Sequence, residues 1–244
     1  PILLFLGAVD GMLLYGLSEF VPNQIRAIYT TVPLDVARTF TFDGGFLSLG
    51  YITIGIIITK LKRFKVALIV TNLLTTVFVG LISRSTPEDP SYFEGMLAAI
   101  GLLTAANTVV PVGGIALVVP SHLLATSNLI LAAIRVIGGL LGLTIFSVVY
   151  NSKANVDIPA AVVPILAQAG VPQDAIPQII GIVLQAPQAL AQVPSIPPAL
   201  LDKILFATAQ ASAGCYRNVW YCIMAASAAC LVSTFFLVDV PERM

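Results

Sequence analysis

Charged residues are scarce in this chain of 244 residues, because only 10% of them are Asp, Glu, Lys or Arg. Soluble globular domains carry about 25% charged residues, so the shortage excludes an ordinary soluble protein. The twelve basic and twelve acidic residues also balance to a net charge of zero. Without an excess of either sign, there is no overall field to attract nucleic acid or a strongly anionic partner.

Metal-binding and catalytic patterns are also missing. The chain has a single histidine, and its three cysteines, Cys215, Cys222 and Cys230, show neither metal-ligand spacing nor a disulfide framework. No HExxH, GxSxG or P-loop motif occurs, and these motifs carry the metal ligands, nucleophiles and phosphate-binding loops of many enzymes. We therefore expect no enzyme activity, no metal site and no cofactor.

Hydrophobic residues make up 58% of the chain and gather in long runs. A helix that crosses a bilayer needs about 20 mostly apolar residues, and six runs approach this length. The runs are continuously apolar and lack the alternation of a membrane β-barrel. The sequence therefore predicts an all-α membrane protein with six transmembrane helices. The predicted spans are residues 2–20, 44–59, 66–83, 96–119, 123–150 and 218–238.

The chain divides into three parts by composition. Residues 1–150 hold five of the predicted helices, and residues 218–244 hold the last helix and a cytoplasmic tail. Residues 151–217 are rich in Pro, Ala and Gln, which predicts an extracellular loop with short amphipathic helices. A re-entrant segment over residues 176–193 that gates the exit is the alternative. Because the chain begins with Pro1 and enters an apolar helix at once, we expect it to be part of a larger protein.

Basic residues predict the orientation in the membrane. Lys60, Lys62, Arg63 and Lys65 cluster between the second and third predicted spans, and such clusters stay on the cytoplasmic side. The first, third and fifth spans then run outward. The end of the last span is cytoplasmic on this prediction.

Arg135 is the only charged residue between residues 123 and 150. An arginine at the bilayer centre costs about 2.5–3.5 kcal/mol on insertion scales, so it usually faces a partner or a water-filled path. At a rise of about 1.5 Å per residue, Arg135, Asp10 and Asn107 all lie about 12–18 Å inside their spans. Transporters hold substrates and coupling ions near this depth. We therefore predict a polar cluster of these three residues on a substrate or proton path.

Two residues of the first span have more than one possible role. Asp10 is either a proton-accepting carboxylate or the salt-bridge partner that makes Arg135 tolerable in lipid, and the two roles are compatible. Tyr15 either donates a hydrogen bond to a polar cargo on the same path or anchors the helix at the membrane interface. Glu19 lies nearer the outer end, where we expect a solvated vestibule.

Glycines in the first and fifth spans show the spacing of close helix contacts. Gly7 and Gly11 are four residues apart, Gly138 and Gly142 likewise, and Gly139 adjoins the second pair. This spacing lets helix backbones approach closely and is common in transmembrane bundles. We expect these five glycines to serve helix packing.

A series of motifs runs in order through nearly the whole chain. It comprises Gly11-Met-Leu-Leu-Tyr15, Val21-Pro-Asn-Gln-Ile25, Arg135-x-x-Gly138-Gly139, Tyr150-Asn-Ser-Lys153, Ala169-Gly-Val-Pro172 and Cys215-Tyr-Arg-Asn-Val-Trp220. In this series the chain resembles fungal trichothecene efflux pumps, which are multidrug-resistance antiporters of the major facilitator superfamily.

The resemblance implies a fold and a function. Members of this family typically have fourteen spans, and this chain corresponds to the last six, the C-terminal half of the fold. The implied partner is the N-terminal half of the same transporter, within the lipid bilayer of the plasma membrane. The implied activity is export of a small-molecule substrate, a toxin or drug, in exchange for protons. Spans one, two, four and five of this half would line the central cavity.

Two alternatives remain open at the level of sequence. Similar fungal proteins import ferric siderophores, which would reverse the direction of transport. The chain could instead be a truncated product without transport activity, or a regulatory partner that associates with a full-length pump.

Overall fold

The computed structural model describes residues 2–61, 63–185 and 198–237, and nearly all of them are helical. Six helices are long and apolar enough to cross a membrane, and the described residues contain no strand. By length and composition, this confirms the predicted all-α membrane protein with six transmembrane helices. The six are α1 (Ile2–Ile28), α2 (Pro33–Leu61), α3 (Phe64–Ile82), α4 (Pro90–Val118), α5 (Leu124–Gln168) and α7 (Pro198–Phe235); the 3-10 helix η1 (Ser121–Leu123) precedes α5, and α6 (Ile176–Gln185) follows it.

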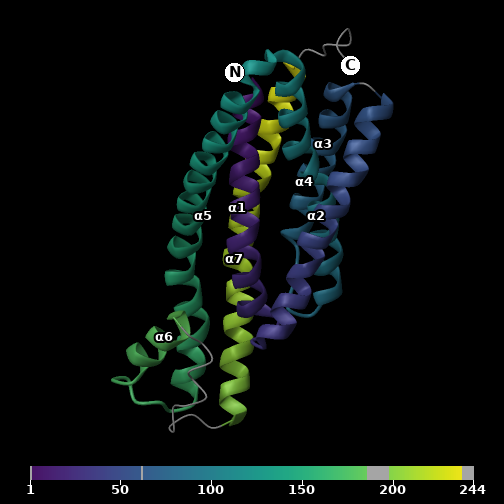
Figure 1. Cartoon of the computed structure of the whole chain (residues 1–244). Helices are drawn as coiled ribbons and strands as arrows, with labels where there is room; N and C mark the ends of the chain where they lie inside the picture. The colour runs from purple at the N-terminus through teal and green to yellow at the C-terminus, as the bar shows by residue number, and fades with distance from the viewer. Residues whose placement is uncertain (1, 62, 186–197, 238–244) are drawn as a thin grey trace.

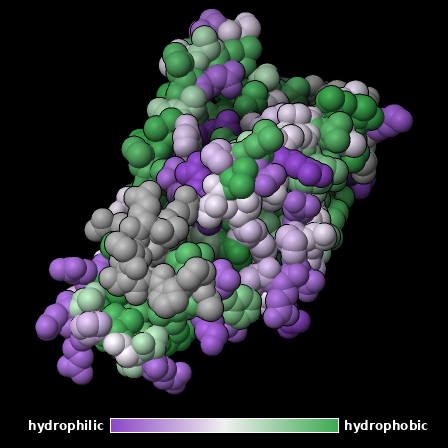
Figure 2. All heavy atoms as spheres, turned by 90° about the horizontal axis from the view of Figure 1, so that it is seen from below, coloured by the Kyte–Doolittle hydropathy of each residue, from purple (hydrophilic) through white to green (hydrophobic). Residues whose placement is uncertain are grey.

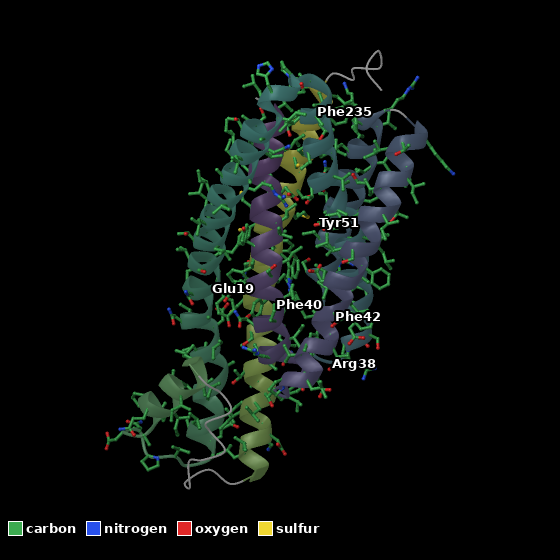
Figure 3. All side chains as sticks on the ribbon, viewed as in Figure 1. Glu19, Arg38, Phe40, Phe42, Tyr51 and Phe235 are labelled. Carbon is green, nitrogen blue, oxygen red and sulfur yellow. The ribbon has the colours of Figure 1, made fainter. Side chains whose placement is uncertain are left out.

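The long helices lie side by side along one axis (Figure 1). α1 begins and α7 ends at the same end of the bundle, where α2 also gives way to α3 (Figure 1). At this end Lys65 Nζ donates a hydrogen bond to the carbonyl of Phe235, 2.8 Å away. Figure 3 shows Phe235 near this upper end and Arg38 near the lower end. The positive-inside rule predicts that the upper end is cytoplasmic.

Apolar side chains fill the centre of the bundle. α1 packs closely against α5, α2 packs against α4, and α7 packs against α1, α3 and α5. Leu6 and Leu13 of α1, Leu68 of α3, and Phe93 and Leu97 of α4 are at most 1% exposed. In lipid, van der Waals packing of this kind holds helices together, because the tails are as apolar as the side chains.

The outer faces of the bundle are also apolar. On α5, Leu129 is 71% exposed, Leu140 61% and Val148 63%. Figure 2, seen from the lower end, shows hydrophobic side chains along much of the rim and many hydrophilic ones on the end itself. Soluble proteins rarely expose apolar surface of this extent, so these faces fit lipid tails or further apolar helices.

α1 and α5 approach each other closely at glycines. A Cβ atom added at Gly11 would overlap the backbone of Arg135, and one added at Gly138 would overlap the backbone of Ala8. The other glycines of the predicted packing set, Gly7, Gly139 and Gly142, lie at the same interface. Backbone cannot rotate away as a side chain does, so Gly11 and Gly138 fix how near α5 lies to α1.

Replacing Gly138 with alanine should therefore lower the stability of the protein. Overpacking typically costs about 1–3 kcal/mol, and the contact here is with backbone. Thermal unfolding in detergent, followed by circular dichroism, measures the loss. Gly45→Ala on α2 is the matched control, because nothing lies within 4 Å of a Cβ at that position. Equal unfolding temperatures for the two variants would contradict the tight α1–α5 contact.

α5 and α7 continue far beyond the predicted spans. The predicted loop at residues 151–217 is largely helical, because α5 runs on to Gln168 and α7 begins at Pro198. α6 corresponds to one short helix of the predicted kind. At about 1.5 Å per residue, the 45 residues of α5 extend about 68 Å, against roughly 30 Å for a hydrocarbon core. Residues 186–193 of the re-entrant alternative and the tail at residues 238–244 lie outside the described residues.

A second apolar cluster explains why α5 does not end at Tyr150. Ala154, Ile158, Val162 and Leu166 repeat every four residues and are at most 4% exposed, and they pack against α6 and α7. A repeat of four places these side chains on one helix face. Its burial offsets the backbone hydrogen bonds that the prolines within α5 remove. The result is a helical extension at the lower end of the bundle (Figure 1).

Candidate functional site

An ion pair joins α1 and α5 inside the bundle. Arg135 Nη2 lies 2.8 Å from Asp10 Oδ2, with 21% of the arginine side chain and 3% of the aspartate side chain exposed. The salt-bridge partner that the sequence suggests for Arg135 is therefore in contact with it. The closeness of the two backbones at Gly11 brings the short aspartate within reach of the guanidinium.

Thr108 of α4 completes a triangle with this pair. Arg135 Nη2 donates a hydrogen bond to Thr108 Oγ1 over 3.1 Å, and Thr108 Oγ1 lies 3.1 Å from Asp10 Oδ2 and 3.3 Å from Oδ1. The hydroxyl therefore accepts from the cation and donates to the anion. α1, α4 and α5 therefore meet at one polar cluster. Thr108 was not predicted from the sequence, because threonine carries no charge that would be costly in lipid.

The polar groups of Asp10, Thr108 and Arg135 are only partly hydrogen-bonded. A buried ion pair is tolerated when hydrogen bonds complete its geometry, because each desolvated ion costs several kcal/mol. Here the carboxylate has both a cation and a hydroxyl donor, but Arg135 Nε is buried without a partner among the described residues. The guanidinium therefore has a further N–H with which to bind another group.

Asn107, the neighbour of Thr108 on α4, contacts α7. It is 1% exposed, its Oδ1 lies 3.9 Å from Cys230 Sγ on α7, and its Nδ2 has no partner among the described residues. Among the described residues Asn107 thus makes no hydrogen bond to Asp10 or Arg135, and its place on a substrate or proton path stays a prediction. The helix turns by about 100° between neighbouring residues, so Thr108 takes the place on α4 that faces the ion pair.

Tyr15 packs on α5 one helical turn after Arg135. Its side chain is 39% exposed, and its ring covers Gly139 so closely that a Cβ there would overlap it. Gln24, nine residues further along α1, is 1% exposed. It accepts a hydrogen bond from Trp220 Nε1 over 2.9 Å and donates one to Ser85 Oγ over 3.4 Å. Gln24 therefore ties α1 to α7 and to the α3–α4 connection.

A polar cavity of about 490 Å³ opens between α1, α5, α6 and α7 toward the lower end. Its polar lining includes Glu19, Asn23 and Arg26 of α1, Asn151 of α5 and Ser212 of α7. Figure 3 shows Glu19 in the lower half of the bundle. Small-molecule sites usually occupy about 300–1,000 Å³, so this cavity has the size for an organic compound. Its nearest lining residue on α1, Glu19, is about two and a half helical turns from Asp10.

Comparison with models of protein families, with curated proteins and with solved structures finds no match for this chain. The resemblance to trichothecene efflux pumps therefore remains a prediction from the motif series. Within residues 2–61, 63–185 and 198–237, no three His, Cys, Asp or Glu side chains gather where they could hold a metal ion. The polar triangle and the cavity below it are the features from which a function is argued.

Proposed function

We propose that this chain is the C-terminal half of a proton-coupled exporter of the major facilitator superfamily, which moves small amphipathic toxins or drugs outward. The observation that carries the proposal is the buried triangle of Asp10, Thr108 and Arg135, contributed by three helices of an apolar bundle. Charges at membrane depth usually mark ion or substrate pathways, because apolar side chains would otherwise be favoured there.

The triangle supports a coupling step. A proton that binds the Asp10 carboxylate removes its negative charge and weakens its attraction to the Arg135 guanidinium. While Asp10 is ionised, its carboxylate accepts a hydrogen bond from a polar group of the cargo beside Arg135, whose Nε lacks a partner among the described residues. The bound proton removes the charge that holds this group and so displaces the cargo. Proton and cargo thus compete for the Asp10 carboxylate, as the exchange of one for the other requires.

The lower cavity supports the choice of cargo. Polar groups such as Asn23 and Ser212 line it together with the apolar side chains of Phe20 and Ile158. A compound with both polar and apolar parts matches these walls. On the predicted orientation, the cavity opens toward the outside and is the last site that the cargo occupies.

The apolar outer faces support a partner half. α1 packs against α4, α5 and α7, and α4 against α2 and α3, so the six helices form one unit. Alternating access in such transporters is a rocking of two units about a central site. We propose that the N-terminal half of the same transporter, in the plasma membrane, provides the second unit.

Transport assays with the full-length protein in proteoliposomes test this proposal. We expect an imposed proton gradient to drive a fluorescent amphipathic compound against its concentration gradient, and the movement to stop when an ionophore collapses the proton gradient. Transport that ignores the proton gradient would contradict the coupling. Absence of movement for a panel of such compounds would contradict the exporter function.

A further inference from the structure

Asp43 is a second buried carboxylate, and the triangle does not use it. It lies on α2 and is 6% exposed. Its Oδ1 is buried and has no hydrogen-bond partner among the described residues. The only salt bridge of the described residues joins Asp10 to Arg135, so no cation pairs with Asp43 there.

Gly101 brings the Asp43 carboxyl against α4. A Cβ added at Gly101 would lie 2.6 Å from the backbone oxygen of Asp43 and 3.2 Å from its Oδ1. Seven residues further along α4 is Thr108, which bonds Asp10. Seven residues rise about 10 Å along a helix, so Asp43 and Asp10 face the same side of α4 at levels roughly two turns apart.

A narrow cavity connects the two carboxylates. Asp10 of α1, Asp43 of α2, and Thr104 and Thr108 of α4 all line it. Its volume of about 10 Å³ is close to the minimum that holds one water, about 10–15 Å³. Because α4 begins at the lower end of the bundle (Figure 1), Asp43 is the carboxylate nearer that end.

The surroundings of the two carboxylates differ in charge. Among the residues that line the cavity, Asp10 is the other titratable group, and Arg135 of α5 neutralises it. On α4, Glu94 accepts a hydrogen bond from Thr39, one turn before Asp43 on α2, over 3.0 Å. Among the residues that line the cavity, an ionised carboxylate at Asp43 would therefore find no cation of its own, at a cost of several kcal/mol. A protonated carboxyl avoids that cost.

We propose that Asp43 is a second proton-binding residue, which takes a proton from the lower end and passes it to Asp10. In this step the Asp43 carboxylic acid loses its proton and becomes a carboxylate, while the Asp10 carboxylate gains that proton and releases Arg135. A water in the cavity and the hydroxyl of Thr104, which lines the cavity between the two levels on α4, carry the proton between them. The link of this transfer to cargo movement rests on the proposed function, whereas proton binding itself does not.

Infrared difference spectra of the purified full-length protein in lipid, recorded while the pH is stepped, test the assignment. We expect Asp43→Asn to remove one carboxylic-acid C=O signal that titrates in the wild-type protein. Asp35→Asn, an exposed change on the same helix, should leave that signal in place. Asp43→Glu should keep a titrating signal at a shifted frequency. A signal in this variant shows that a change at position 43 does not by itself unfold the protein.

The outcomes separate this inference from the proposed function, because the spectra do not depend on transport. If Asp43→Asn keeps every titrating carboxylic-acid signal of the wild-type protein, Asp43 does not bind a proton, even in a protein that exports cargo. Loss of the signal supports the proton site, and a wild-type protein that shows it but moves no cargo overturns the exporter function alone.

Discussion

Transport by the full-length protein should fall about tenfold or more when Arg135 is replaced with alanine, while the six helices still insert into the membrane. Removing Arg135 takes the cation from the proposed path, and a loss of only about 1.4 kcal/mol in binding of the cargo at the rate-limiting step already slows transport about tenfold. The variant leaves Asp10 inside the bundle with Thr108 as its remaining partner. Initial rates in proteoliposomes, normalised to the amount of inserted protein, measure the effect.

Two variants distinguish a transport role of Arg135 from a role in stability. Arg84→Ala removes an exposed arginine of the α3–α4 connection and should leave the transport rate unchanged. The double variant Asp10→Asn with Arg135→Gln removes both charges, so its thermal stability should recover toward the wild-type value. Transport should nevertheless stay low. Full transport by the double variant would reduce the ion pair to a structural contact.

Asp10→Asn should abolish the response of transport to the proton gradient. An asparagine has nearly the shape of the aspartate but cannot bind and release a proton near neutral pH. The competition between proton and cargo at residue 10 then disappears, and the transport rate no longer follows an imposed pH difference. Initial rates at several external pH values, with the internal pH held constant, measure this loss of dependence.

Asp174→Asn is the matched control for this substitution, because Asp174 is exposed in the connection between α5 and α6. Its pH profile should equal that of the wild-type protein. If Asp10→Asn keeps the wild-type profile and only unfolds at a lower temperature, Asp10 is the structural partner of Arg135 and the proton binds elsewhere.

The positions of the membrane helices were predictable, but their ends were not. Each of the six predicted spans falls on one of the six long helices, because lipid tolerates only apolar runs that satisfy their own backbone. Helical hydrogen bonds do not stop at the edge of the hydrocarbon, however. α2 begins at Pro33 and includes the charged Asp35 and Arg38, which a search for apolar residues excludes.

The candidate site was predictable where charge made a residue costly. Asp10 and Arg135 stand out in apolar runs for that reason, and the structure pairs them. Depth along a helix does not give its rotation, and so Asn107 was chosen where Thr108 makes the contact. Asp43 was missed because it lies one residue before the predicted second span. At the end of a membrane span, a carboxylate is expected to be exposed to solvent.

The hydrogen bond from Trp220 to Gln24 has a consequence for experiments on motion. Trp220 is the single tryptophan of the chain, it is 2% exposed, and its indole nitrogen contacts α1 from α7. Indole fluorescence responds to the polarity and bonding around the ring. The fluorescence of Trp220 therefore reports on the interface between α1 and α7. Sliding of one helix along the other would change the emission of the indole ring, so no added dye is needed.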